Sequence, residues 1–254
     1  MPGVKVRDIE MKIRPADDIV ISPPAGNSSH HQNRLPTSIE VEKEIRIGDP
    51  SRVCHYKGCI YVGRITSAID RIDKDGAVTE SFIRLDGYPC GIIAHEDRLY
   101  VLQLGTPYFI QAFNLLGQHL FKRKLNDSVI KDYLGRALAV LNHDELVVAD
   151  RTKNRFSIYS LTGKLLRSVK CDEIGASKVS LCHAGGDSII VTNCEASHEL
   201  FRFNLATETV EWRSNSVKQP SAVAMLNKEY ALVTERDGSD QVKFFVVDHM
   251  RGEL

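Results

Sequence analysis

Polar residues follow directly after five short apolar runs, and four of the five carry side-chain oxygen atoms. The runs begin at residues 60, 99, 146, 189 and 231. The residues that follow them are Arg64, Gln103, Asp150, Asn193 and Glu235. Amide and carboxylate oxygens are the ligands that a hard cation such as calcium prefers, so one interpretation is a metal site. The other is that these side chains cap the backbone where strands end, as Asp and Asn do.

The capping interpretation fits the residues around Asp150 best. Asp150 and Asn154 flank a short polar stretch, and both residue types favour turns. Arg64 in the same set would repel a cation or form an ion pair in its place. We therefore expect no metal, and keep Asp150, Asn193 and Glu235 as the weak candidates.

Basic residues gather in two stretches that could contact phosphate. They are Lys122, Arg123, Lys124, Lys131 and Arg136, and then Arg151, Lys153 and Arg155. Single-stranded RNA is bound by such groups together with aromatic side chains. However, the stretches that follow the other apolar runs, such as 105–107 and 236–240, are neutral or acidic. We expect a solvated surface loop, with RNA contact as the alternative.

No catalytic motif is present in the sequence. GxSxG, P-loop and GxGxxG patterns are absent, and no Ser/His/Asp grouping can be selected. The His30–His31 pair lies in a linker without a third ligand. His95 and His143 are expected between the first and second strands of their repeats, at the opposite end from the polar ring. We therefore predict a protein that is not an enzyme and needs no cofactor.

The composition excludes several other function classes. The 254 residues include 33 Lys and Arg and 33 Asp and Glu, so the formal net charge is zero and steering toward nucleic acid or membrane would have to be local. The six Cys form no CxxC pair and mostly lie in apolar runs, as buried free thiols do. Without a signal peptide or an apolar segment of about 18 residues, a cytoplasmic location and no membrane partner are expected.

The spacing of the apolar runs predicts the architecture. Each run belongs to a unit of about 43 residues that contains three apolar strands, a turn and an outer strand. A Gly stands in this turn in every unit except the fourth, whose turn must be built differently. No unit shows an apolar stripe of helical period. A four-stranded antiparallel sheet repeated at this length is a blade of a β-propeller, so the fold class is all-β.

The two ends of the sequence bear on how the ring closes. We assign residues 1–38 to an N-terminal extension and residues 39–254 to the propeller. Five blades are visible in the sequence, and six are possible. The last blade stops where its outer strand should begin, and a spare strand lies at 39–47. We expect residues 41–47 to pair with the last blade and close the ring. Residues 1–38 could instead supply part of a sixth blade or serve as a tether, and the sequence leaves this open.

The third unit resembles an NHL repeat. Its apolar strand is followed by Asp150, then by Asn154 and Arg155, an alternating strand and the turn at Gly163. The other units keep the apolar strands but lack most of the Asp, Asn and Arg residues of this pattern. The whole resembles the C-terminal propeller of tripartite-motif-like NHL proteins, which implies six blades and a substrate-recognition role. The RING, B-box and coiled-coil segments typical of that family are not visible, so ubiquitin-ligase activity would lie outside this chain.

The ring of polar residues also resembles the calcium site of propeller lactonases and related esterases. That resemblance implies a calcium-dependent hydrolase as a further alternative. The interpretation that we favour is a non-catalytic scaffold that binds a protein or peptide through the loops of one face, with no small-molecule substrate. The predicted contact residues are Arg64, Gln103, Tyr108, Asp150, Arg151, Lys153, Arg155, Asn193 and Glu235. Tyr108 and Arg151 are the expected anchors, because Tyr and Arg dominate binding hot spots.

Overall fold

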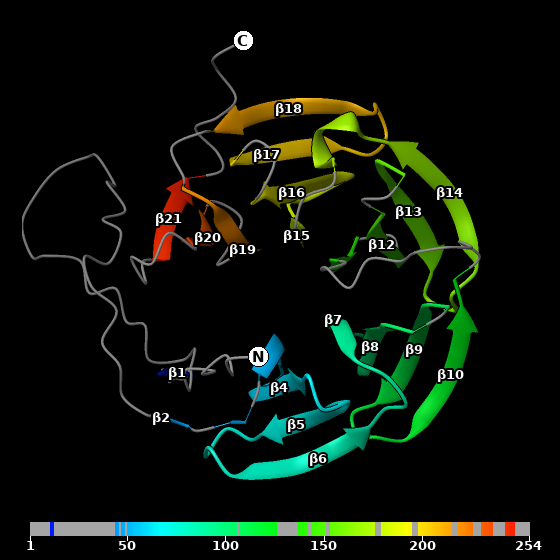
Figure 1. Ribbon diagram of the computed structural model, residues 1–254, viewed down its shortest axis with the longest axis vertical. Coiled ribbons are helices and arrows are strands. Elements are labelled where there is room, and N and C mark those ends of the chain that lie inside the picture. The colour runs from blue at the N-terminus through cyan, green and yellow to red at the C-terminus, as the bar shows by residue number, and fades with distance from the viewer. Residues whose placement is uncertain are drawn as a thin grey trace, which may run out of the picture.

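The described strands form four four-stranded antiparallel sheets and one three-stranded sheet arranged around a central axis, together with a two-stranded sheet (Figure 1). The computed structural model describes residues 11–12, 44–45, 47–48, 50–105, 107–125, 137–141, 144–150, 153–175, 179–194, 198–214, 218–225, 230–235 and 242–246. This arrangement is a β-propeller, as the repeat predicts. No helix within these ranges is long and apolar enough to span a membrane.

Five blades follow one another along the chain. The first contains β3 (Pro50–Tyr56), β4 (Cys59–Arg64), β5 (Ala68–Ile72) and β6 (Val78–Arg84). The second contains β7 (Pro89–His95), β8 (Arg98–Gln103), β9 (Phe109–Asn114) and β10 (His119–Lys124). The third contains β11 (Leu138–Val140), β12 (Glu145–Asp150), β13 (Arg155–Ser160) and β14 (Leu165–Lys170). The fourth contains β15 (Val179–His183), β16 (Ser188–Asn193), β17 (Glu199–Asn204) and β18 (Thr209–Ser214), and the fifth β19 (Pro220–Met225), β20 (Tyr230–Glu235) and β21 (Val242–Val246).

The order of strands within each blade runs from the axis to the rim. The first strands, such as β7 and β15, lie innermost, and the fourth strands, such as β10 and β18, lie outermost (Figure 1). In the first four blades the second and third strands are mostly buried because neighbouring blades cover both of their faces. Apolar side chains therefore form layers between blades; for example, the rings of Phe156 and Phe203 join the third and fourth blades at 5.4 Å.

The turn between the third and fourth strands fixes how closely two blades approach. Gly117 and Gly163 both have φ of 80°, which glycine adopts without strain. A Cβ at Gly117 would lie 3.1 Å from the Phe82 carbonyl oxygen of the preceding blade. A Cβ at Gly163 would lie only 2.7 Å from Cγ of Arg123. Each turn thus packs against the outer strand of the blade before it.

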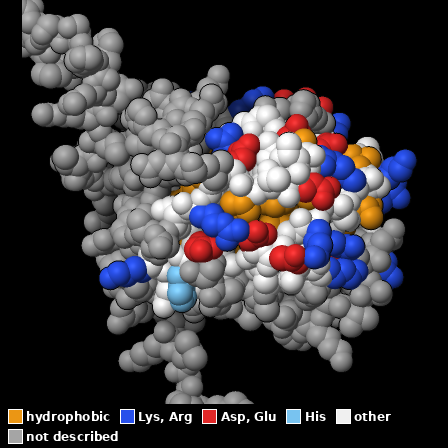
Figure 2. Space-filling view, turned by 90° about the horizontal axis from the view of Figure 1, so that it is seen from above, with side chains coloured by type: hydrophobic (Ala, Val, Ile, Leu, Met, Phe, Trp, Pro, Cys, Tyr) orange, Lys and Arg blue, Asp and Glu red, His pale blue; other side chains and the backbone are white. Residues whose placement is uncertain are grey.

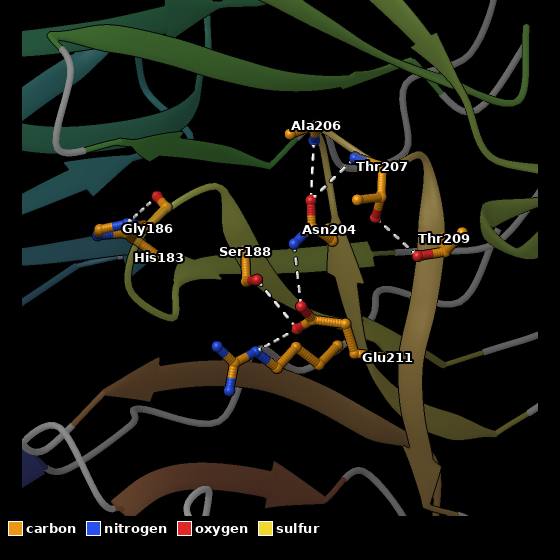
Figure 3. Close-up of polar contacts among 9 residues, drawn as sticks. His183, Gly186, Ser188, Asn204, Ala206, Thr207, Thr209 and Glu211 are labelled. Atoms are coloured by element: carbon orange, nitrogen blue, oxygen red, sulfur yellow. Dashed lines mark hydrogen bonds and ion pairs between the residues drawn. The ribbon is translucent and has the colours of Figure 1, made fainter. Parts of the chain in front are cut away.

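The fourth blade builds this turn without glycine, as its sequence requires (Figure 3). The side-chain oxygen of Asn204 accepts hydrogen bonds from the backbone N–H of Ala206 at 2.9 Å and of Thr207 at 3.0 Å. Glu208 takes the positive φ, at 59°. Below the turn, Glu211 accepts hydrogen bonds from Ser188 at 2.9 Å and from Asn204 at 3.0 Å.

The N-terminal strand β2 pairs differently from our expectation. Within the described residues, β21 pairs with β20 only, and β2 (Glu44–Ile45) pairs with β1 (Met11–Lys12). The prediction that residues 41–47 pair with the last blade is therefore wrong for the part that the structure describes. A strand pattern shows that a strand exists but not which partner strand it joins, and the partner here, β1, lies in the N-terminal extension.

The position of β2 is nevertheless that of an outer strand. Ile47 packs against Ile60, Val62 and Ile72 of the first blade. Leu85, which follows β6, packs in the same way against the second blade. Figure 1 shows β1 and β2 between the fifth and first blades. This arrangement favours the alternative in which the N-terminal extension supplies part of a sixth blade, while the boundary at residue 38 stays a prediction.

Candidate partner-binding face

The second-to-third-strand connections of all five blades lie at the same end of the axis, because the strands alternate in direction. The fourth strands of the first four blades, β6, β10, β14 and β18, also end here. We call this end the loop face and define it by residues 64–68, 103–109, 150–155, 193–199 and 235–242. Residues 106, 151–152, 195–197 and 236–241 fall outside the described part of the chain. Arg151, one of the two predicted anchors, is among them.

The five polar residues of the predicted ring each end the second strand of a blade, as the sequence indicates. They do not line the axis, however, because the first strands lie innermost (Figure 1). Gln103, Asp150 and Asn193 are at most 2% exposed. The side chain of Glu235 is not described. Gln103, Asp150 and Asn193 are therefore enclosed beneath the loop face.

The partners of these side chains are structural. Oδ2 of Asp150 lies 3.5 Å from Nε of Arg155, its register partner on β13. In the first blade the same link has its charges exchanged, since NH1 of Arg64 lies 3.5 Å from Oδ2 of Asp70 on β5. These pairs tie the second strand to the third and support the interpretation that the ring residues hold the strand ends.

Two amide members of the ring follow the same principle. The side-chain amide of Gln111 on β9 donates a hydrogen bond to Oε1 of Gln103. Nδ2 of Asn193 donates to the carbonyl oxygen of Glu173 at 2.7 Å, which ties β16 to the connection between the third and fourth blades. Buried polar groups with such partners are stabilised in one geometry and are poorly placed to contact a macromolecule.

Tyr108 does not serve as a surface anchor in this conformation. Its side chain is 4% exposed and packs in the core between the second and third blades. Its carbonyl oxygen accepts a hydrogen bond from the N–H of Leu125 at 2.9 Å. The sequence places Tyr108 beside an apolar strand, where an aromatic residue fits the core as well as the surface. Lys153, by contrast, is exposed, and Arg155 is half-buried beside Asp150.

One exposed apolar residue of the loop face, Ile65, was not predicted from the sequence. Ile65 follows Arg64 in the tight turn closed by the hydrogen bond from Ser67 N–H to the Arg64 carbonyl, and it is 51% exposed. The signal was a branched apolar residue inside a turn, where polar residues are usual. It borders Thr66, which is also exposed.

Lys122 is committed to partners on the same face. Nζ of Lys122 lies 2.5 Å from Oδ2 of Asp86 and 4.2 Å from the ring centroid of Phe109. The hydrogen bond from Lys122 lowers the pKa of Asp86. A basic residue that the sequence presents as a phosphate contact is thus already paired with a carboxylate.

Charges of both signs also alternate on the rim. Figure 2 shows the side above β18, where basic and acidic side chains surround an apolar strip. Arg213 contacts Glu173 at 2.8 Å and Glu199 at 3.6 Å, and Arg202 contacts Glu211 at 2.6 Å. This side of the molecule therefore has no surface of a single sign among the residues that the figure colours.

Comparison with known proteins shows the fold. No protein-family model and no curated protein matches the sequence. A protein of unknown function from Bacteroides caccae is similar in structure, with a TM-score of 0.67, 16% identity and 82% of each chain covered. A chain of a nidogen/laminin complex has a TM-score of 0.65 and 16% identity over 82% of this chain and 81% of that one. The WD40 domain of Neurospora crassa Pan2 has a TM-score of 0.58 and 10% identity over 80% and 64%. At these identities the similarity establishes the propeller and nothing finer.

Proposed function

We propose that this protein is a non-catalytic propeller scaffold that binds a protein or peptide across the loop face. The observation that carries the proposal is that the residues beneath the loops of that face are buried and hydrogen-bonded. Gln103, Asp150 and Asn193 are buried beneath the loops and held by partners. A rigid frame that displays exposed loop residues lowers the entropic cost of binding.

The contact surface that we propose centres on Ile65. An exposed apolar side chain beside polar ones suits the buried centre of a small interface. Lys153, which is exposed on the third blade, provides a charged rim contact. We also retain Arg151 as a proposed anchor, and Glu235 as a proposed rim residue.

The finer assignment, also a proposal, is the substrate-recognition module of a tripartite-motif-like NHL protein in the cytoplasm. The pairing of Asp150 with Arg155 supports this assignment, because it gives two residues of the NHL-like pattern of the third blade a structural role. Two of the similar structures come from assemblies, the nidogen/laminin complex and the mitotic checkpoint complex. Six free thiols suit a reducing compartment.

The test is affinity capture from the native cell lysate with matched variants. Ile65→Asp combined with Lys153→Glu alters the loop face. Leu116→Asp changes a residue that is 75% exposed in a turn at the opposite end, and serves as the control. We expect partners captured by the wild-type protein to be lost with the loop-face variant and kept with the control.

Two outcomes would contradict the proposal. Partners that persist with the loop-face variant would place binding elsewhere. RNA that remains crosslinked after stringent washing, with no protein retained after nuclease treatment, would favour a single-stranded RNA-binding propeller.

A further inference from the structure

The end of the axis opposite the loop face brings a histidine and two carboxylates together. The hairpin between β7 and β8 carries His95 and Glu96, and Asp144 stands at the start of β12 in the next blade. Nε2 of His95 lies 2.8 Å from Oδ1 of Asp144. One ligand atom from each of the three residues lies within 4.8 Å of those of the other two.

We propose that His95, Glu96 and Asp144 bind a divalent transition-metal ion such as zinc, which joins the hairpins of the second and third blades. Zinc is bound by imidazole nitrogen and carboxylate oxygen at about 2.0–2.2 Å, so ligand atoms around a tetrahedral ion are about 3.3 Å apart. The His95–Asp144 contact at 2.8 Å is shorter than this value, and the other separations are at most 4.8 Å. A small opening of the His95–Asp144 contact and a rotation of the exposed Glu96 side chain would complete three corners, with water at the fourth.

A buried tyrosine behind the cluster points the same way. Tyr100 is 0% exposed, and its hydroxyl group has no hydrogen-bond partner in the structure. Burial raises the pKa of Tyr100, the neighbouring Arg98 lowers it, and the charges of Glu96 and Asp144 raise it further. The hydroxyl therefore lies within the field of both carboxylates. A cation bound between these carboxylates would offset the charges that act on this hydroxyl group.

The donor set selects the class of ion. Calcium and magnesium prefer oxygen ligands alone, whereas an imidazole with carboxylates suits zinc and similar transition metals. Without a metal, the contact between His95 and Asp144 is a surface pair, with the two side chains 28% and 55% exposed. Such a pair adds little to stability. Metal binding should therefore raise the melting temperature by more than the His95–Asp144 pair contributes without metal.

The neighbouring hairpins provide matched controls. Asp97, one residue beyond Glu96, pairs with Lys57 of the first blade at 2.5 Å, so Asp97→Asn removes a link between blades without removing a proposed ligand. His183 lies at the same end in the fourth blade, where its Nε2 contacts the Gly186 carbonyl oxygen at 3.0 Å. His183→Ala therefore tests whether any histidine at this end accounts for binding.

The experiment uses the full chain without an affinity tag, freed of metal by a chelator. Zinc is titrated calorimetrically, and cobalt(II) is added to record its visible absorption. We expect one ion per chain, a higher melting temperature with zinc, and binding weakened at least about tenfold in His95→Ala and Asp144→Asn. Asp97→Asn and His183→Ala should bind as the wild-type protein does.

The melting temperature without metal shows whether each variant is folded. Absence of stoichiometric binding to the wild-type protein would overturn the proposal. Binding unchanged in folded His95→Ala would overturn it as well, and so would binding lost in His183→Ala.

Discussion

Removal of the Asp150 carboxylate tests whether the polar ring is structural or binds a metal. The side chain of Asp150 is 1% exposed, and Oδ2 lies 3.5 Å from Nε of Arg155, whose side chain is 24% exposed. Two unit charges at this distance attract by about 4–5 kcal/mol at an effective dielectric constant of 20. Partial hydration of Arg155 recovers some of this. We therefore expect Asp150→Ala to lower the free energy of unfolding by about 3 kcal/mol, since it removes the buried carboxylate that the half-buried guanidinium group of Arg155 contacts.

A loss of this size is readily measured. For a chain of this length it corresponds to a fall in melting temperature of roughly 6–12 °C, and a lower urea midpoint should accompany it. The double variant Asp150→Ala with Arg155→Ala should recover part of the loss, because both charges of the contact are then removed together. Lys170→Ala, which breaks the exposed contact with Asp172, is the control and should leave the midpoint unchanged.

Two results would refute this reasoning. One is an Asp150→Ala protein that melts like the wild-type protein, since the ion pair would then contribute nothing. The other is a wild-type melting temperature that falls when a calcium chelator is added, together with an Asp150→Ala protein that no longer responds to the chelator. That combination would restore the lactonase-like metal site.

Three further predictions concern stability. Glu208→Gly should raise the melting temperature by about 1–4 °C in a thermal scan, because Glu208 has φ of 59°; a lower melting temperature would contradict this. Gly163→Ala should cost about 2–3 kcal/mol in urea unfolding and Gly186→Ala about 1 kcal/mol, because both have positive φ but only Gly163 lacks room for a Cβ; equal losses would show that the contact with Arg123 does not matter. Burial and the Glu173 charge raise the pKa of Cys171 from 9.0 to about 12, so this thiol ionises in the unfolded chain before it does so in the folded one, and its contribution to stability is lost as pH rises from about 9 to 12. Unfolding midpoints measured across that range should fall more steeply for the wild-type protein than for Cys171→Ala, and parallel curves would exclude this thiol as a cause.

The fold could be predicted because the pattern that specifies it is repeated. A second strand buried on both faces must be continuously apolar, and such strands recur from Ile60 to Val233 with a Gly turn at a constant distance. The exception was visible as the missing Gly of the fourth unit, whereas the role of Asn204 in that turn came from the structure. Closure could not be predicted, because β2 is an outer strand by pattern whichever edge it joins.

The candidate site was predicted less well, for a physical reason. The sequence showed that Gln103, Asp150 and Asn193 end strands, but a polar residue at a strand end has the same pattern whether it is buried or exposed. Its depth depends on which strand lies innermost and on a partner that only the register supplies, such as Arg155 opposite Asp150. The contact between His95 and Asp144 joins residues 49 positions apart in different blades and leaves no local signal.

The packing of each turn against the blade before it means that the curvature of the ring is set at its periphery. Three successive contacts join the outer edges of neighbouring blades. Gly117 packs against Phe82, Gly163 packs against Arg123, and Arg167 donates a hydrogen bond to the Leu205 carbonyl oxygen at 2.7 Å. A larger side chain at one of these contacts would widen the angle between adjacent sheets, and such changes in angle would add up from blade to blade. The number of blades that complete the circle is therefore a property of these small contacts as much as of the number of repeats in the chain.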